Sequence, residues 1–452
     1  MCIRDRSTDQ IFESMEDEYF KQRAEDIISV GKHLIFNMQN IDIKISLDEN
    51  TILIASDLTP ADTSSMDLSK VSGIILKEGG FTSHAVIVAK NLGIPCVIGV
   101  KELMDNITNG ESVSIDGSSG DIIISPNDNQ ISTLKQKQGK IEKLIQNFTE
   151  EKYKKLGVEF RVNIGSLEEI NSFNHSFLNS IGLFRSEFIY LDNTTNPTLE
   201  QQSSVLEKIT QKFTGTIVYR TLDIGGDKQV SYLNLPVEEN PFLGVRGIRL
   251  SLNNLDLFDS QIKSILNSDS LDKIKIMFPM ISTIEDYLEA KEFVNKIAKD
   301  LNVESPPMGI MVETPSSAFI ADKFSEIVDF ISIGTNDLTQ YIMAADRGNS
   351  NLSHYHDPLH PSVLRAISNV IDCCHANNIE VSVCGEMSSD PVSALALYIL
   401  GLKTFSMAPS AAPFVFDILN TNSEINKQST KELILSLNNA QQTRKTIQEI
   451  IN

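Results

Sequence analysis

The sequence lacks the features that mark several large classes of protein. No apolar run approaches the ~20 residues that a membrane-spanning helix needs, and only 7% of the 452 residues are aromatic. Basic side chains are also few: Lys and Arg number 39 and Asp and Glu number 60, so the formal net charge is −21. This excess of negative charge opposes non-specific binding to nucleic acid or to an anionic membrane, and any anion-binding site must therefore be local.

Paired cysteines are missing as well. The five cysteines include no CxxC spacing, and their odd number argues against a disulfide framework or a zinc site. The first ten residues, MCIRDRSTDQ, lack the hydrophobic core of a signal peptide, so we expect a cytoplasmic protein. The length and the 41% hydrophobic share predict a globular protein of two or three domains.

The N-terminal third predicts a helix and then a small α/β domain. Apolar residues recur at helical spacing over 11–39, which predicts one amphipathic helix. Short β-branched runs come next, and a DGSSG turn precedes a last such run, DIIISP. The other expected strands are 51–56, 71–77, 94–100 and 112–116. Residues 129–156 are polar with sparse apolar positions, which predicts one solvated helix that connects two domains as a hinge.

From residue 157 onward, buried-strand patterns alternate with helical stretches. Eight β-then-α units between residues 157 and 420 match the size and rhythm of a (β/α)8 barrel, whose active site lies at the C-terminal ends of the strands. The expected strands are 160–165, 181–184, 216–225, 273–280, 308–313, 330–334, 380–385 and 404–407. The fold class is therefore α/β, with a small domain followed by a TIM barrel.

Polar residues gather at these predicted strand ends, a placement that packing alone does not explain. Five arginines lie on or near strand ends, and in an acidic chain they predict a local pocket for a small polyanion such as phosphate or carboxylate. They are Arg185, Arg220, Arg246, Arg249 and Arg347. The alternative is that some of them pair with surface carboxylates.

Two acidic residues and one cysteine also lie at predicted strand ends. Glu313 in MVETP and Asp337 in GTNDL end adjacent strands, so with a phosphate they can converge on Mg²⁺, unless each merely caps the next helix. Cys384 in SVCGE also ends a strand, where its thiol can give or take a proton, although a buried structural cysteine is the common outcome. We expect Cys96, Cys373 and Cys374 in cores, and His354, His356 and His360 in a loop.

One histidine of the small domain has the setting of a phosphoryl acceptor. In GGFTSHAVIVAK, two glycines make a turn and His84 enters the first turn of the following helix. A helix N-terminus disfavours the imidazolium, keeps the ring nucleophilic and stabilises a phosphoryl group. A lone histidine is commonly structural, but the glycines and hydroxyl residues before His84 favour a functional role. Thr63 in LTPADT offers a further hydroxyl contact.

Several motifs occur together: GGFTSHAVIVAK, LFRSEFIYLD, RTLDIGGDK, NPFLGVRGIRLSL, KIMFPMI, GIMVETPSSA, FISIGTNDLTQY, DRGN and VCGE. With them the chain resembles, over nearly its whole length, the phosphoenolpyruvate-protein phosphotransferases, enzyme I of the sugar phosphotransferase system. TSH followed by GIP also occurs in pyruvate phosphate dikinase and phosphoenolpyruvate synthase. RTLDIGGDK and GTNDLTQY give the finer assignment.

The resemblance implies a Mg²⁺-dependent reaction in which phosphoenolpyruvate (PEP) gives its phosphoryl group to Nε2 of His84. Pyruvate is released, and His84 passes the phosphoryl group to the carrier protein HPr. Cys384 would protonate the enolate carbon, Glu313 and Asp337 would bind Mg²⁺, and Thr63 would contact the histidine. The implied substrate-binding residues are Arg185, Arg220, Arg246, Asn336, Asp337 and Arg347.

The resemblance also implies a domain order and a homodimer formed through the barrel. Its parts are a remnant helix of the HPr-docking subdomain at 1–40, a swivelling phosphohistidine domain at 41–128, a helical linker at 129–156 and the PEP-binding barrel at 157–452. Family members carry more sequence at the N-terminus, so we expect this chain to be N-terminally incomplete and to lack most of the HPr-docking subdomain.

Two rival hypotheses remain. A fragment of a PEP synthase or dikinase would need a nucleotide-binding domain ahead of His84, but residues 1–83 are too few for one and no Walker-type loop occurs. A non-catalytic PEP sensor would bind PEP without phosphorylation of His84. The complete set of motif residues favours the enzyme.

Overall fold

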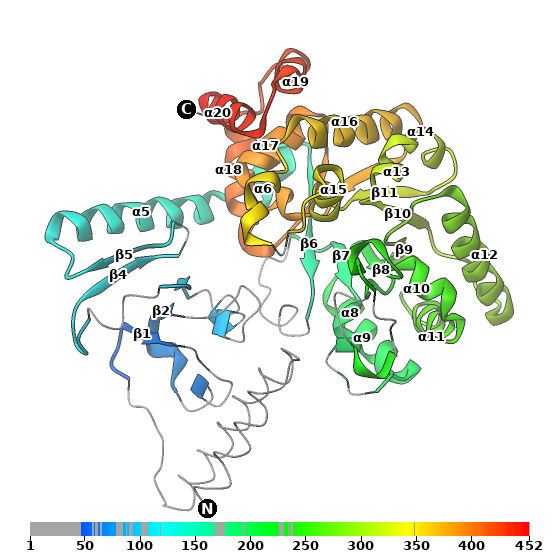
Figure 1. The fold of residues 1–452 in the computed structure, drawn as a ribbon, viewed down its shortest axis with the longest axis horizontal. Coiled ribbons are helices and arrows are strands. Elements are labelled where there is room, and N and C mark those ends of the chain that lie inside the picture. The colour runs from blue at the N-terminus through cyan, green and yellow to red at the C-terminus, as the bar shows by residue number, and fades with distance from the viewer. Residues whose placement is uncertain are drawn as a thin grey trace, which may run out of the picture. The chain divides into compact units, whose positions relative to one another are not determined.

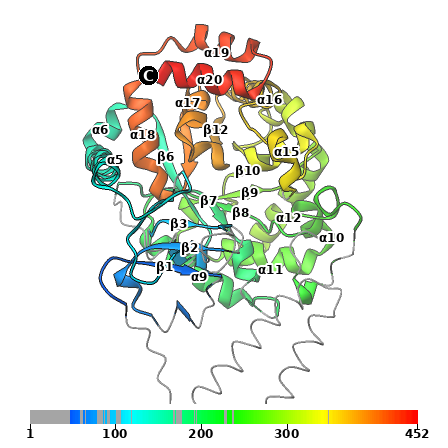
Figure 2. The same ribbon diagram turned by 60° about the vertical axis from the view of Figure 1, so that its left-hand side comes forward.

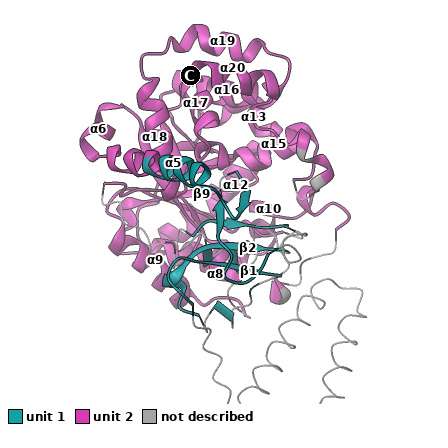
Figure 3. Cartoon of the chain, turned by 90° about the vertical axis from the view of Figure 1, so that its left-hand side faces the viewer, with its two compact units in different colours: residues 1–139 teal, residues 140–452 magenta. Residues whose placement is uncertain are grey.

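The computed structural model (Figure 1) describes residues 47–451 except 57, 59–61, 64–65, 78–84, 87, 90–93, 101–106, 118, 167–168, 170–176, 192, 194, 226–229, 234, 236–237 and 348. His84 and the helix predicted at 11–39 therefore lie outside the described residues. The chain divides into two compact units, residues 1–139 and 140–452, which Figure 3 colours separately. In the described part of the chain, no helix has both the length and the apolar character needed to cross a membrane.

The first unit contains the predicted short strands. A parallel sheet has the order β1-β2-β3, and β4 and β5 form an antiparallel pair. The bounds are β1 Thr51–Ala55, β2 Val71–Leu76, β3 Cys96–Val97, β4 Val113–Asp116 and β5 Asp121–Ile124. Gly120 completes the turn before β5 at a φ of +77°, a conformation that favours glycine. Ile74 and Leu76 of β2 pack with Ala85 and Ala89 in a small core.

The second unit contains a closed barrel of eight parallel strands, which confirms the predicted fold class. The strands run around the barrel in the order β10-β11-β12-β13-β6-β7-β8-β9. Their bounds are β6 Glu159–Ile164, β7 Ile181–Arg185, β8 Ile217–Arg220, β9 Ile274–Phe278, β10 Met308–Val312, β11 Phe330–Ile333, β12 Glu380–Val383 and β13 Thr404–Met407. Strand β8 is shorter than the predicted 216–225, and beyond it the Leu222 N–H donates to the Gln261 side chain at 3.0 Å.

Helices connect the barrel strands. They are α8 Glu187–Leu191, α9 Leu199–Lys212, α10 Ile248–Asn253, α11 Leu255–Leu266, α12 Ile284–Leu301, α13 Pro315–Phe319, α14 Ala321–Phe324, α15 Thr335–Met343, α16 Pro361–Ala376, α17 Pro391–Ile399 and α18 Ala412–Thr421. Capping boxes at Thr198 and Thr283 begin α9 and α12. After the barrel, α19 Lys427–Ser436 and α20 Ala440–Ile451 pack on α17, and α19 also contacts α16 (Figure 2).

Charged side chains form a network at the ends where the barrel strands begin. Glu380, the first residue of β12, accepts hydrogen bonds from Arg161 of β6 at 2.7 Å and from Lys275 of β9 at 2.8 Å. Arg161 also contacts Glu159 at 2.9 Å and is only 4% exposed. These bonds join three strands across the barrel, at the end opposite to the one where active sites of such barrels lie.

The prediction of a single helix over 129–156 is wrong. Two helices occupy this stretch, α5 Asp128–Asn147 and α6 Glu150–Lys155. Phe148 lies between them and is only 5% exposed, because its ring packs against Phe160, Phe177 and Phe416 at centroid distances of 6.3, 5.0 and 5.3 Å. The aromatic contacts of Phe148 therefore fix the end of α5 to the core of the second unit.

Candidate active site

Arg220 occupies the C-terminal end of β8 and is held by two buried carboxylates. Its Nη2 lies 2.5 Å from Glu187 Oε1 and its Nη1 lies 2.9 Å from Asp223 Oδ2. Burial by itself would lower the pKa of Arg220, but Asp223 and Glu187 outweigh it and keep the pKa above its usual value. The guanidinium is therefore permanently charged and fixed in orientation.

Two other arginines lie next to Arg220. Arg185 ends the neighbouring strand β7 and pairs with Arg220 in the ladder. Arg246 is 1% exposed, and its Nη2 lies 3.3 Å from Asp223 Oδ1, so this one carboxylate contacts both Arg220 and Arg246. The three residues that sequence analysis assigned to anion binding at this side of the barrel thus lie on adjacent segments.

The loop before Arg246 is tied to α15. The Phe242 ring centroid lies 5.5 Å from the Arg246 guanidinium carbon, a cation-π distance. The Tyr341 hydroxyl of α15 donates a short hydrogen bond to the Phe242 carbonyl. Burial raises the pKa of Tyr341 to about 12, so the hydroxyl remains a donor at neutral pH.

Two carboxylates converge at the next strand ends. Glu313 follows β10, is 1% exposed, and accepts a hydrogen bond at Oε1 from the Met280 N–H at 2.6 Å. Asp337 lies in the first turn of α15, where Arg347 Nη1 is 3.7 Å from its Oδ1. Burial, with Asp223 and Asp337 nearby, raises the pKa of Glu313 to about 8.

This pair fits a hard cation such as Mg²⁺. Glu313 is a buried carboxylate whose pKa is raised mainly by burial, and Asp337 Oδ1 is a buried atom without a hydrogen-bond partner among the described residues. Within those same residues, no group of three or more His, Cys, Asp or Glu side chains could hold a metal ion. The two carboxylates would therefore supply part of an oxygen shell, and a bound anion and water would complete it.

Cys384 directly follows β12, is 3% exposed, and lies at the centre of several hydrogen bonds. Its thiol donates to the Ile333 carbonyl at an Sγ to oxygen distance of 3.7 Å, and its own carbonyl accepts from Asn163 Nδ2 at 3.0 Å. Burial raises the pKa of Cys384 to about 11. The thiol is therefore protonated at neutral pH and suits a proton donor better than a nucleophile.

The other predicted site residues are Asn336, Arg347, Thr63 and His84. Asn336 is half-buried, and its Oδ1 accepts from the Glu386 N–H at 3.0 Å. The Arg347 side chain is 35% exposed at the rim. Thr63 is buried in the first unit, and His84 lies outside the described residues, so their predicted contact stays a prediction.

Arg249, two histidines and three cysteines were also singled out in the sequence. Arg249 bonds the Leu243 and Gly244 carbonyls and Ser282, which anchors the loop near Arg246. His360 accepts from the Ser362 N–H as the N-cap of α16, and His354 lies in a 3-10 helix, Ser350–Tyr355, rather than in an irregular loop. Of the cysteines expected in cores, Cys374 is fully buried, and Cys96 and Cys373 are partly buried.

The residues that orient the arginines and Glu313 were not predicted from the sequence. Glu187 and Asp223 had no predicted role, whereas the structure shows that Glu187 contacts Arg220 and that Asp223 contacts both Arg220 and Arg246. Met280 gave no signal, because its contribution to the site is a backbone N–H. Asn163, which bonds the Cys384 carbonyl, could have been noticed as an amide inside a buried strand pattern.

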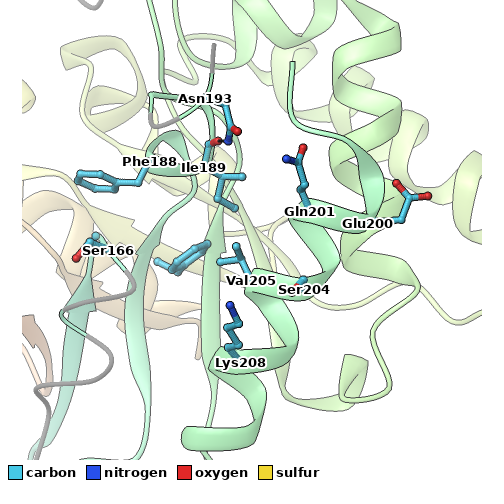
Figure 4. A pocket seen from close by; sticks show the side chains of 11 residues that line it. Ser166, Phe188, Ile189, Asn193, Glu200, Gln201, Ser204, Val205 and Lys208 are labelled. Atoms are coloured by element: carbon cyan, nitrogen blue, oxygen red, sulfur yellow. Dashed lines mark hydrogen bonds between the residues drawn. The ribbon is translucent and has the colours of Figure 1, made fainter. Parts of the chain in front are cut away.

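A cavity of about 440 Å³ lies elsewhere in the second unit (Figure 4). Its walls come from the ends of β6 and β7 and from α8 and α9, and they combine Phe184, Phe188 and Val205 with the charged Glu200 and Lys208. None of the predicted site residues lines this cavity. We therefore place the candidate active site around Arg220, Glu313 and Cys384 rather than in this cavity.

Comparisons with known proteins identify the family of both units. A family model described as "PEP-utilising enzyme, mobile domain" matches residues 47–120, and one described as "PEP-utilising enzyme, PEP-binding domain" matches residues 137–422. All the candidate site residues from Arg185 to Cys384 fall within the second match.

Curated relatives match nearly the whole chain. A phosphoenolpyruvate-protein phosphotransferase of Mycoplasma capricolum is 37% identical over 98% of this chain and 80% of the relative. The Bacillus subtilis protein of that name is 38% identical over 97% of this chain and 80% of the relative. The Geobacillus stearothermophilus protein of that name is 37% identical over 96% and 77%.

Proposed function

Because this chain belongs to the phosphoenolpyruvate-protein phosphotransferases, we propose that it transfers the phosphoryl group of PEP to His84 and then to the carrier protein HPr. Pyruvate is the other product, and the reaction is the first step of the phosphotransferase system for sugar uptake. The observation that carries this proposal is the group of buried arginines and acids at the C-terminal ends of β7, β8 and β10.

The arginines bind the anionic groups of PEP. Arg220 lies ready for this role because Glu187 and Asp223 fix its guanidinium before the substrate arrives, and its Nε is a buried donor with no hydrogen-bond partner among the described residues. Fixed donors stabilise charge that moves during phosphoryl transfer without having to reorganise. Arg185, Arg246, Arg347 and Asn336 supply further contacts to the phosphate and carboxylate.

Glu313 and Asp337 hold Mg²⁺ in this proposal. The cation, when bound, neutralises charge on the phosphate and carboxylate of PEP, so that a neutral imidazole can approach phosphorus. Met280 fixes Glu313 Oε1 through its N–H, which orients the carboxylate toward the substrate side of the barrel. Asp337 also lies within reach of Arg347, which links the acid to the rim of the site.

Cys384 completes the reaction by protonating carbon. Phosphoryl transfer leaves the enolate of pyruvate, and the thiol proton moves to its C3 while the oxygen becomes a carbonyl. The raised pKa of Cys384 keeps the thiol protonated until that step. The thiolate that remains regains a proton from solvent before the next turnover.

The proposed roles of His84 and Thr63 come from the sequence. The acceptor role of His84, the contact with Thr63, the hinge at 129–156, the docking of HPr and the homodimer are proposed from the sequence pattern and the resemblance. Size-exclusion chromatography with light scattering tests the homodimer, and titration with HPr tests the docking.

The central experiment is a single-turnover reaction with ³²P-labelled PEP and Mg²⁺. We expect an acid-labile, base-stable label that mass spectrometry locates on His84, and no label on a His84→Gln variant that still binds PEP. PEP binding without label in the unmodified chain would contradict the proposed function and favour a PEP sensor.

A further inference from the structure

Cys384 lies where two neighbouring strands of the barrel stop pairing. Strands β12 and β13 pair over two positions, of which the last is Val383 with Phe405, and in the described part of the chain their ladder ends there. The next residues in this register are Cys384, directly after β12, and Ser406 of β13. The Cys384 carbonyl therefore needs a donor from outside this ladder.

The side-chain amide of Asn163 on β6 supplies that donor. Its Nδ2 donates to the Cys384 carbonyl at 3.0 Å and to the Ser406 carbonyl at 3.3 Å. A carbonyl oxygen can only accept, so the nitrogen of the amide must face this pair. The fully buried Ser406 fixes that orientation, because its hydroxyl donates to Asn163 Oδ1 at 2.5 Å. One side chain of β6 thus spans β13 and reaches the residue that follows β12.

Other hydrogen bonds hold the Cys384 segment from the side of β11 and α15. The Cys384 N–H donates to the Ile333 carbonyl at the end of β11 at 3.1 Å. The Glu386 N–H donates at 3.0 Å to Oδ1 of Asn336, in the first turn of α15. Gly385 lies between them, and a side-chain carbon on it would come within 2.8 Å of a backbone nitrogen of α15. The segment is therefore packed closely against α15 on one side, and Asn163 holds it on the other.

The thiol itself lies in an apolar cluster inside the barrel. One member of this cluster, Met311, accepts a hydrogen bond at Sδ from Arg220 Nη1 at 3.7 Å, so the cluster extends to the proposed PEP-binding arginine. Another member, Leu183, is the register partner of Asn163. Apolar contacts have no directional preference, so the direction of the thiol depends on the backbone of Cys384. The other members of the cluster are Val218, Met277 and Phe330.

We propose that Asn163 is a positioning residue for Cys384, because its amide fixes the Cys384 backbone and with it the direction from which the thiol proton reaches C3 of the enolate. This inference deepens the proposed function and rests on it. In this step the S–H bond breaks and its electron pair stays on sulfur, while the C3–H bond forms from the enolate electron pair. A proton donor must lie within hydrogen-bond reach of the accepting atom, so a small displacement of the thiol slows the step.

Three variants test the role of this amide. Asn163→Leu has a side chain of similar shape that can donate to neither carbonyl. Ser406→Ala keeps the amide but removes the hydroxyl that orients it, so it should show the same defects in weaker form. It also keeps the proposal testable if Asn163→Leu does not fold. Asn369→Leu is the matched control, because it removes an amide that donates to the Ala318 carbonyl at 2.9 Å, between α16 and α13.

The first test measures whether the amide holds the segment. Hydrogen exchange followed by mass spectrometry reports the opening of the peptide that contains Cys384 and Glu386. Losing the bonds of one amide should raise the exchange rate of this peptide about five- to tenfold in Asn163→Leu. Asn369→Leu should leave it unchanged. Equal exchange of this peptide in Asn163→Leu and in the unmodified protein would overturn the proposal.

The second test measures the direction of proton delivery. PEP that carries deuterium at one of its two C3 positions reacts with the full chain and Mg²⁺ in tritiated water, and the configuration of the pyruvate methyl group is determined. A thiol fixed on one face of the enolate gives one configuration, which we expect for the unmodified protein and for Asn369→Leu. Asn163→Leu should lose most of this preference, because the enol then takes its proton from water on either face.

The same variants separate phosphoryl transfer from carbon protonation in one turnover. In Asn163→Leu the label on His84 should form at the normal rate, since Arg220 and Glu313 are unchanged. Pyruvate, detected by lactate dehydrogenase, which reduces the ketone and not the enol, should lag about 10- to 100-fold behind the label.

Two results would overturn the proposal. One is pyruvate that keeps pace with the label and carries a single methyl configuration in Asn163→Leu. The other is slow labelling with that single configuration retained, because it would show that Asn163 has a structural role only. Absence of label in the unmodified protein would instead refute the proposed function, and hydrogen exchange would still decide whether Asn163 holds the Cys384 segment.

Discussion

The Met280 N–H donates a hydrogen bond to Glu313 Oε1 at 2.6 Å, from a residue whose φ is +57°. A left-handed backbone at a non-glycine residue is costly and persists where the surroundings impose it. Here it turns a main-chain donor toward a buried carboxylate whose pKa is raised. The strained turn after β9 thus fixes one oxygen of the acid and leaves the other for a ligand.

Glu313→Gln should abolish the Mg²⁺ dependence of the reaction. The amide keeps the size of the side chain but carries no charge for the cation, so the rate of His84 labelling should fall by at least about a hundredfold. The measurement is a Mg²⁺ titration of the single-turnover rate. Glu326→Gln, at an exposed acid of the same barrel, is the control. An unchanged Mg²⁺ titration in Glu313→Gln would remove Glu313 from the metal site.

Arg220→Lys should lower both the labelling rate and the stability. One ammonium cannot contact Glu187 and Asp223 with the geometry of the guanidinium fork, and a buried carboxylate would lose part of its compensation. We expect labelling to slow by about 10² to 10³ fold and urea denaturation to shift to lower concentration. Arg365→Lys, at a surface arginine that bonds the Leu435 carbonyl, should change neither. Normal labelling by Arg220→Lys would contradict the assigned role.

Glu380→Gln should destabilise the protein at neutral pH but not in acid. Burial alone would raise the pKa of Glu380, yet hydrogen bonds from Arg161 and Lys275 outweigh it and lower the pKa. A lowered pKa stabilises the fold above the unfolded-state pKa and loses that contribution as the pH falls through the folded-state value. The expected loss in the free energy of unfolding is about 1 to 3 kcal/mol at pH 7.

The check is urea unfolding of both proteins at pH 7 and at steps below the ordinary pKa of 4.5. The difference between Glu380→Gln and the unmodified protein should shrink as the pH falls. A difference that is constant from pH 7 into acid would show that the ionised carboxylate contributes no pH-dependent stability.

Phe148→Ala should destabilise the second unit strongly, whereas Phe319→Ala should not. Both changes remove the same atoms, but Phe148 is 5% exposed among other aromatic rings and Phe319 is 81% exposed. The buried change should cost about 3 to 5 kcal/mol, and the exposed one should stay within about 0.5 kcal/mol. Thermal unfolding followed by circular dichroism distinguishes them. Equal melting temperatures would mean that Phe148 does not anchor α5 to the barrel.

The barrel itself was predictable from the sequence because its strands are short apolar runs at regular intervals. All eight runs became strands of the closed ring. The positions of Arg185, Arg220, Glu313 and Cys384 followed as well, since parallel strands in a barrel bring their C-terminal ends to one mouth. Sequence position thus predicted which residues are neighbours at that mouth.

The partners of those residues were not predictable. Glu187 lies beyond the end of β7, and the strand registers from β6 to β8 are irregular, with shifts after Val162 and Ile181 that no residue pattern announces. The break at Phe148 was missed for a related reason. One aromatic residue in a polar stretch fits a solvated helix equally well until the rings that it contacts are known.

The pairing of β13 with β6 affects how the chain folds during synthesis. The hydrogen bond between Ser406 and Asn163 spans 243 residues, and these two strands close the ring. One edge of β6 therefore stays unpaired until the ribosome has synthesised almost the whole second unit. Such long-range closure slows folding and exposes strand edges, so the nascent chain should depend on molecular chaperones more than its small first unit does.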